Sequence, residues 1–586
     1  LLVGCVAFAT SCDLTENVQV KADKSMIFGS KSGLELYSNS FYKALPTLKN
    51  GFMQDKMCDV GAVSNTDTFI KQGAYNTETA TSWSWGALKN VNYSIDGCND
   101  PKYCTVEAET RDNYLGIARW FRAWFYYDKL TTYGEVPWFP NDIQSYQNDV
   151  MYKDRDSRDV IIRNLIADLD FAYEHIQATS STGSATLTRW AAAALKSRVC
   201  LFEAAYRRYH NLTGLEITPE ELYREAAKAA KLVIDNSGCS LNTAAGKKGA
   251  YRDLFYSETP LTQEVILAVC ANEKSGIFGE QNWWFNARSY GLCWSLVRSF
   301  VHTYLKQDGT PFTAAADYAV KSFAEEMEGR DLRLEQTVRG RNFLWDGKTA
   351  VADIKNLSLT GYQVIKYTLD ESKYDGGAKN INSIPLIRYA EVLLNYAEAQ
   401  AELGVLTDSE WALTVGALRK RAGITGGTET LPTTVDSYLQ RTFYPDVTSP
   451  VLLEIRRERA IELVAEGMRF DDLRRWKCGS LMETLPWSGI HIPGLEQPVD
   501  VNGDGVNDYY FTEGEVASAP AAYKNIAVRV NQDGVGLYAE ANPVSGYDLV
   551  YKTGAGDRYW YPDGRQYLYP IPAKVIRDYR NAGYTI

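Results

Sequence analysis

Apolar residues that recur at helical spacing over long stretches limit most strongly how this chain can fold. In residues 157–176, Ile161, Leu165 and Leu169 repeat every four residues, which is typical of the buried face of a helix. Comparable runs occupy residues 109–134, 188–210, 218–238, 385–404, 407–423 and 449–467. Small residues stand where neighbouring helices would approach each other. The pattern predicts a mainly α-helical protein built as a scaffold of tetratricopeptide-like helix pairs.

Local signals mark the ends of two of these helices. Ser157 precedes the run at 157–176 and is a candidate N-cap, because its hydroxyl can accept a backbone N–H. Thr218 is followed by Pro219 at the first helical position, and Gly238 stands after the last apolar residue. The first segment is therefore predicted to begin close to Ser157. The second is predicted to begin close to Thr218 and to end close to Gly238.

Long irregular stretches interrupt the helical runs. We expect residues 13–586 to form a single domain, with loop insertions near residues 60–90, 239–365 and 485–570. A few short strands are expected within them, for example at 264–270 and 361–367. Because loops of this length are uncommon in compact proteins unless they serve a function, they are the places to look for a site.

The first twelve residues resemble the end of a bacterial lipoprotein signal. The apolar run is followed by Ala9, Thr10, Ser11 and then Cys12, which we expect to be the acylated residue. Cys5 also fits the pattern, but cleavage there would leave an apolar stub before the polar residues. The alternative is a buried N-terminal strand. A lipid on Cys12 would hold the protein to a membrane without a spanning helix.

Charge and motifs exclude several functions. The net charge of −11 and a pI near 5.2 argue against binding to nucleic acid, because phosphate recognition needs a basic surface. Beyond the N-terminus, no run of eighteen apolar residues predicts a membrane span. The chain has only 4 histidines, and the HExxH, GxSxG and Walker patterns are missing from the sequence. We expect a protein that is not an enzyme and carries no organic cofactor.

A dense run of charges at 454–476 needs a separate interpretation. Glu454, Glu458, Glu462 and Glu466 repeat every four residues, and like charges at this spacing destabilise an isolated helix. Six arginines follow or alternate with them, and Arg388 and Glu391 are plausible partners from another helix. Since every acid has an arginine nearby, we interpret the run as a structural ion-pair network. Paired catalytic carboxylates are the weaker alternative.

Aromatic side chains in polar loops indicate a ligand site. The chain has 39 Tyr, 14 Trp and 20 Phe, and flat rings in exposed loops can cover the apolar faces of sugars. Two stretches supply the candidate ligand-binding residues: Tyr75, Asn76, Trp83 and Trp85 in the first, and Trp283, Trp284, Arg288 and Tyr290 in the second. The alternative for each tryptophan is packing of the loop onto the helices.

Residues 500–511 suggest a calcium loop. Asp500, Asn502, Asp504, Val506 and Asp508 occupy loop positions 1, 3, 5, 7 and 9, and Gly505 stands at position 6. Position 12 is Phe511, so the usual bidentate glutamate is missing there, although Glu513 could replace it. A structural Ca²⁺ is our expectation, and a turn without metal is the alternative, because Asp, Asn and Gly also favour turns.

Several segments together resemble the SusD/RagB family of nutrient-binding lipoproteins. The similar stretches follow the family order and cover nearly the whole chain: 122–138, 187–202, 330–334, 361–367, 384–404, 418–424, 458–476 and 568–576. The resemblance implies a tetratricopeptide-type scaffold decorated with loops. It implies that ligand contacts come from loops near the two aromatic stretches, without matching residue for residue, and that the charged run belongs to the scaffold.

The resemblance also implies a role. It predicts a lipid-anchored protein on the outer face of the cell outer membrane that binds oligosaccharide or polysaccharide. The ligand would be delivered to a SusC-like TonB-dependent transporter, the expected partner. Binding of peptides or glycopeptides by the same scaffold is the first alternative. A surface glycan hydrolase and a helical scaffold for protein assembly are the others.

Overall fold

A computed structural model describes residues 24–50, 55, 57–73, 75–144, 146–246, 248–286, 293–552 and 556–586. The signal-like segment 1–12 with Cys12 lies outside the described residues, as do the candidate ligand residues Arg288 and Tyr290. The expectations made for them are therefore left as predictions.

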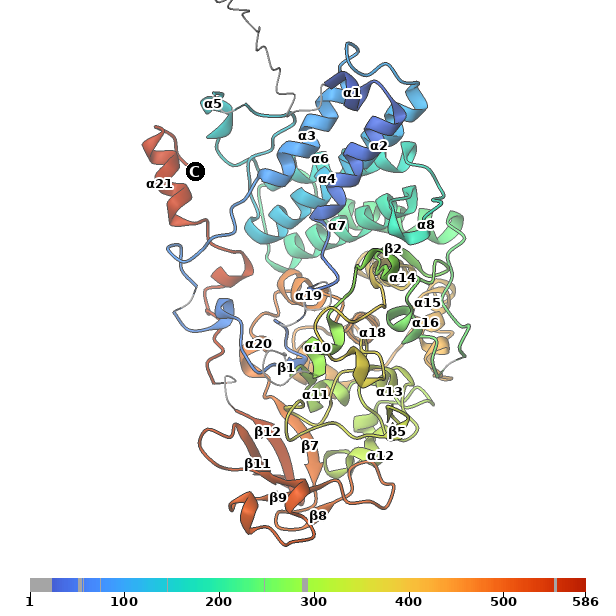
Figure 1. The fold of residues 1–586 in the computed structure, drawn as a ribbon, viewed down its shortest axis with the longest axis vertical. Helices are drawn as coiled ribbons and strands as arrows, with labels where there is room; N and C mark the ends of the chain where they lie inside the picture. Colours follow the sequence, from blue (N-terminus) through green and yellow to red (C-terminus); the bar gives the residue numbers. More distant parts are fainter. Residues whose placement is uncertain are drawn as a thin grey trace, which may run out of the picture.

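One half of the molecule is a stack of helices (Figure 1). The longest are α3 (Gly86–Asn99), α4 (Ala108–Tyr133), α6 (Arg158–His175), α7 (Arg189–Tyr209), α8 (Pro219–Asn236), α14 (Tyr389–Glu402) and α18 (Pro450–Glu462). Successive helices contact each other, since α4 packs on α6, α6 on α7, α7 on α8, and α8 on α14. The predicted mainly helical scaffold of paired helices is confirmed.

The predicted helix ends are confirmed as well. The Ser157 side chain accepts the Val160 N–H at the start of α6. At α8, Thr218 and Glu221 cap each other reciprocally, with Pro219 as the first helical residue. Gly238 follows the helix with a φ of 73°, in the left-handed region that favours glycine. These caps satisfy N–H and C=O groups that a helix end leaves without partners.

The other half carries short elements and small sheets, shown in the lower part of Figure 1. In residues 485–570, β7 (Ser488–Ile492), β12 (Tyr547–Tyr551) and β11 (Leu537–Ala541) form an antiparallel sheet. A second sheet contains β8 (Pro498–Val499), β9 (Tyr509–Thr512) and β10 (Ala527–Arg529). This region, expected as an irregular insertion, thus holds two three-stranded sheets. Most of its buried apolar residues join the main core, which extends in sequence from Phe28 to Tyr567, and Tyr510, Ala519 and Ala527 form a small cluster of their own.

Two predicted helices differ from the structure. The run at 385–404 begins as a strand, β6 (Ile384–Arg388), which pairs antiparallel with β2 (Val265–Val269) before α14 starts. The run at 407–423 is divided at Thr414, where ψ is −92°, into α15 (Asp408–Leu413) and α16 (Val415–Arg421). In both cases the apolar spacing fits a continuous helix, but contacts in the folded chain favour a strand in the first segment and a break in the second.

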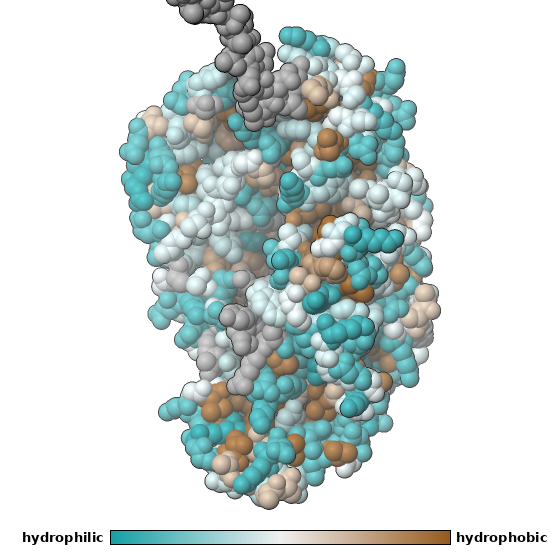
Figure 2. Space-filling view, in the orientation of Figure 1, coloured by the Kyte–Doolittle hydropathy of each residue, from teal (hydrophilic) through white to brown (hydrophobic). Residues whose placement is uncertain are grey.

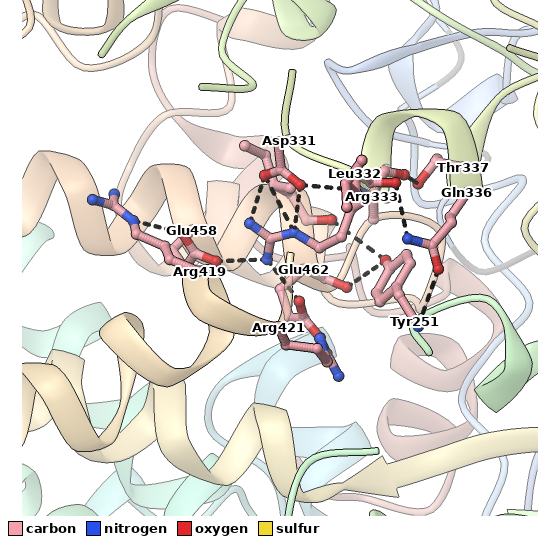
Figure 3. A network of polar contacts seen from close by, with 12 residues as sticks. Tyr251, Asp331, Leu332, Arg333, Gln336, Thr337, Arg419, Arg421, Glu458 and Glu462 are labelled. Carbon is pink, nitrogen blue, oxygen red and sulfur yellow. Dashed lines mark hydrogen bonds and ion pairs between the residues drawn. The ribbon is translucent and has the colours of Figure 1, made fainter. Parts of the chain in front are cut away.

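The charged run lies inside the scaffold as an ion-pair network (Figure 3). Glu462 of α18 is fully buried and receives Arg388 Nη1 at 2.6 Å and Arg333 Nη1 at 2.7 Å, together with a guanidinium nitrogen of Arg421. Burial raises the pKa of Glu462, but the three arginines outweigh this effect and hold the pKa well below its usual value. The carboxylate therefore remains ionised although no water surrounds it.

The network connects segments that are far apart in sequence. Arg333 also forms a bidentate pair with Asp331 at 2.7 Å and contacts Glu458 at 2.5 Å. Glu466 was expected on the same helix but lies in the turn after α18, where Arg388 and Lys366 bind it. Glu391, expected as another partner of the stripe, pairs with Arg198 instead. These carboxylates are occupied by arginine or lysine and buried, as expected for a structural network.

Figure 2 shows a surface on which hydrophilic side chains predominate and hydrophobic ones are scattered, several of them at the lower end. Within the part of the chain that the structure describes, no helix combines the length and apolar character needed to cross a membrane.

Candidate functional site

A cleft of about 700 Å³ lies where the loop before α3 meets the end of the chain. Its walls come from α3, from the segment 139–152 and from α21 (Ala573–Asn581). Aromatic and apolar side chains dominate the lining: Trp83, Trp85, Phe139, Ile143, Tyr152 and Tyr579. A cleft of this size and character is suited to a small organic ligand.

Trp83 and Trp85 lie side by side in this cleft and are held from behind. Their ring centroids are 5.4 Å apart, and both side chains are half-buried. Trp83 packs edge-on against Tyr133 of α4 at 4.9 Å, and Trp85 packs against Phe139 at 5.3 Å. One part of each ring thus fastens the loop to the scaffold, while another part lines the cleft. The packing interpretation of these tryptophans is therefore confirmed, and their ligand role stays a prediction.

Polar groups stand at the edge of the aromatic surface. Lys89, Lys574 and Asp578 line the cleft with exposed side chains, and Asn141 donates to the Asp96 carboxylate at 2.7 Å. Within the described ranges, neither lysine forms a salt bridge. The cleft therefore combines flat apolar rings with hydrogen-bonding groups at its rim.

The end of the chain closes one side of the cleft. The N–H of Ala573, at the start of α21, donates to the Thr77 carbonyl at 2.8 Å. Arg577 pairs with Glu78 at 3.1 Å. On the opposite side, the Tyr579 hydroxyl donates to the Lys153 carbonyl at 3.3 Å. The helix α21 is thereby fixed between two loops that belong to the first third of the sequence.

Tyr75 and Asn76 shape the loop beside this cleft. The Tyr75 hydroxyl lies 3.0 Å from the carbonyl oxygens of both Arg565 and Leu568. The Asn76 side chain accepts the N–H groups of Glu78 and Thr79, which is a local turn. Both residues line a smaller pocket of about 180 Å³, which shares Ala80 and Thr81 with the larger cleft. The Tyr75 hydroxyl and the Asn76 amide oxygen thus have structural roles within the protein, while Asn76 as a residue is exposed.

Trp283 and Trp284 do not line the cleft that holds Trp83 and Trp85. They lie on the short helix α10 (Gln281–Asn286), with their rings T-shaped at 5.0 Å. The Trp284 Nε1 donates to Glu280, which also pairs with Lys49 at 3.0 Å. The structure therefore places the second aromatic stretch in another part of the surface, and its ligand role stays a prediction.

Carboxylates of the predicted calcium loop accept hydrogen bonds from the backbone of the same loop. Asp500 accepts the N–H groups of Gly503, Asp504 and Gly505, and Asp508 accepts the Val501 N–H at 2.8 Å. Burial and the nearby carboxylates of Asp504 and Asp500 raise the pKa of Asp508. Across the described ranges, no three His, Cys, Asp or Glu side chains gather in a metal-binding arrangement. Calcium binding stays a prediction here, and it would require backbone carbonyl oxygens as ligands in addition to the carboxylates.

The sequence did not point to the residues that complete the cleft. Lys574, Asp578 and Tyr579 lie in an amphipathic helix near the chain end, whose sequence gives no sign of a site. The segment 139–152 carries Asn141 and Tyr152 in an ordinary polar loop. Only the fold brings these segments to Trp83, so a pattern within any one of them could not have revealed the cleft.

Comparison with known proteins defines the class. The chain matches the model of the SusD family over residues 263–584. No curated protein matches the chain. Because the family match covers more than half of the sequence, the protein belongs to the SusD family.

Solved structures agree with this fold. A SusD-like protein from Bacteroides fragilis NCTC 9343 is 20% identical, with a TM-score of 0.66 over 95% of this chain and 97% of that chain. A SusD-like carbohydrate binding protein from the same organism is 19% identical, with a TM-score of 0.67 over 95% and 99%. A third structure, described with xylogluco-oligosaccharide, is 18% identical, with a TM-score of 0.50 over 76% and 82%.

Proposed function

We propose that this protein captures a glycan in the aromatic cleft and performs no chemistry on it. The observation that carries the proposal is the pair Trp83 and Trp85, half-buried and adjacent, in a cleft of about 700 Å³. Rings fixed in this way can cover the apolar face of a sugar without losing further side-chain freedom. Lys89, Lys574 and Asp578 at the rim are available to the hydroxyl groups.

The cellular role follows from the family and from the first residues of the sequence. In this proposal the chain is anchored through lipid on Cys12 to the outer face of the outer membrane. It passes its ligand to a SusC-like TonB-dependent transporter. Family membership and the lipoprotein-like sequence at residues 1–12 support this role. Two similar structures, one of a carbohydrate binding protein and one with xylogluco-oligosaccharide, support a glycan as ligand.

Calorimetry tests the proposal. Soluble protein lacking residues 1–12 is titrated with a panel of oligosaccharides that includes xylogluco-oligosaccharides, and with peptides as a second panel. We expect saturable binding to one glycan class without release of products. The variant Trp83→Ala should weaken binding at least about tenfold, which corresponds to about 1.4 kcal/mol.

A matched control separates the cleft from the rest of the surface. Trp345 is a half-buried tryptophan on the hairpin of β4 (Leu344–Trp345) and β5 (Lys348–Thr349), outside the lining of the cleft. Trp345→Ala should leave the affinity unchanged. Binding of peptides but not of glycans would assign the protein to the first alternative. Equal losses in both variants would remove the cleft as the site.

A further inference from the structure

A second pocket of about 370 Å³ lies far from the aromatic cleft. It is enclosed by residues before and in α12 (Phe323–Met327), by the end of β7, and by the segment 498–501. In Figure 1, α12 and β7 lie at the lower end of the long axis, whereas α21 lies near the upper end. Any ligand in this pocket is therefore separate from a ligand bound at Trp83.

His491 lines this pocket and has a ring nitrogen that a ligand could reach. The residue is only 7% exposed. Nδ1 lies 3.0 Å from the Asp548 carboxylate, which is itself held by Arg298 at 2.6 Å and by Asn542 at 2.9 Å. In the described part of the chain, the other ring nitrogen, Nε2, has no hydrogen-bond partner.

The contact with Asp548 fixes the chemistry of the imidazole. A carboxylate accepts hydrogen bonds, so Nδ1 carries a hydrogen and Nε2 is the ring nitrogen left for a ligand. Gly546 lies directly beside this nitrogen, since a Cβ at that position would stand 2.8 Å from Nε2. His491 is thus an oriented hydrogen-bonding group, nine-tenths buried, whose Nε2 must be satisfied by solvent or by a ligand.

The other walls of the pocket define the ligand class. Phe323, Ile490 and Pro498 supply an apolar surface, and Ser545, Glu325 and Asp500 supply oxygen atoms. The Asp500 carboxylate already accepts three backbone N–H groups of its own loop. Among the described residues that line the pocket there is no lysine or arginine, so an anionic ligand has no counter-charge. The Glu325 carboxylate already accepts the Ser322 N–H and hydroxyl, both at 2.8 Å, which partly compensates its charge.

We propose that this pocket is a second binding site, which takes an uncharged polyhydroxylated ring such as a neutral monosaccharide unit. Hydroxyl groups of the ring form hydrogen bonds with His491 Nε2 and with Glu325, and one C–H face rests on Phe323 and Pro498. The volume of about 370 Å³ is in the range of pockets that hold small organic ligands. The proposal does not depend on the aromatic cleft being a glycan site.

Histidine NMR gives a direct test, because the chain has only 4 histidines. Protein with ¹⁵N-labelled histidine, kept in EDTA, is titrated with methyl glucoside, methyl galactoside and methyl xyloside, and separately with n-butylammonium. His491→Gln assigns the His491 signals. We expect at least one glycoside to shift the His491 Nε2 resonance saturably, while the signals of the other histidines stay in place.

Two variants keep the outcome interpretable. Ser545 is exposed at the rim, so Ser545→Tyr should narrow the pocket without disturbing the fold and abolish the shift. Trp83→Ala removes the cleft platform and should leave the shift intact. The proposal is overturned if no glycoside moves the His491 signals, if n-butylammonium alone moves them, or if Ser545→Tyr leaves the response unchanged.

Discussion

Arg388 holds Glu466 with two nitrogen atoms, Nε and Nη2, each 2.7 Å from a different carboxylate oxygen. This bidentate pair joins the end of β6 to the turn after α18, 78 residues further along the chain. A planar guanidinium suits such a pair better than an ammonium group does. Because the pair is buried, neither group can exchange its partner for water.

Removal of this arginine is therefore expected to be costly. Arg388→Met leaves Glu462 and Glu466 with fewer counter-charges in the core, and we expect a loss of about 3–5 kcal/mol in the free energy of unfolding. Urea denaturation measures it. Arg163 pairs with Glu216 on the surface, so Arg163→Ala should cost less than about 1 kcal/mol. Similar losses in the two variants would contradict a structural role for the buried network.

Asp55 should make stability fall as the pH rises. This buried carboxyl accepts the N–H groups of Gly467 and Arg469, and burial raises its pKa to about 7 from 3.8. The folded state holds the proton between about pH 4 and 7, whereas the unfolded state has lost it. The stabilisation that Asp55 contributes is fully present below about pH 4, and it is lost as the pH rises to about 7.

Asp55→Asn removes that decline, because the amide does not ionise but can still accept a backbone N–H. Thermal unfolding between pH 4 and 8 should show a stability that rises more steeply with pH in the variant than in the parent. A variant and a parent with parallel profiles would show that Asp55 titrates normally.

His210 should have the opposite effect to Asp55 and make the stability fall as the pH falls. Its Nε2 donates to the Arg474 carbonyl at 2.8 Å, and burial lowers its pKa to about 4 from 6.5. Between these values the unfolded state binds a proton that the folded state does not, so stability is lost as the pH falls from about 6.5 to 4. In His210→Gln this loss should disappear. The measurement is the same pH series of unfolding curves, and a steeper acid loss in the variant would refute the assignment.

Calcium is expected to stiffen the loop at 500–508. Asp500, Asp504 and Asp508 repel one another, and a cation would remove this repulsion. We expect millimolar Ca²⁺ to raise the melting temperature, and Mg²⁺ to do so less. Asp504→Ala should abolish the difference. If EDTA and Ca²⁺ give the same melting temperature in the parent protein, the loop is a turn without metal.

Much of the helical scaffold could be predicted from the sequence, because caps such as Thr218 and Pro219 act locally. The strand β6 could not be predicted, because the apolar residues of Ile384–Arg388 also fit the spacing of a helix. Its pairing with β2 joins segments that are far apart in sequence. The lining of the aromatic cleft was predicted in part. Trp83 and Trp85 stood out by composition, but their partners on α21 are brought to them only by the completed fold.

The hydrogen bonds from Tyr75 to Arg565 and Leu568 span 490 and 493 residues. One wall of the aromatic cleft comes from residues 80–92 and another from residues 572–579, which are synthesised much later. A growing polypeptide can complete most of its helical layers as they emerge. It cannot offer a finished cleft until residues 573–581 are released. The complete cleft is a property that a nascent chain acquires only after these residues emerge, and termination before them would yield a scaffold without it.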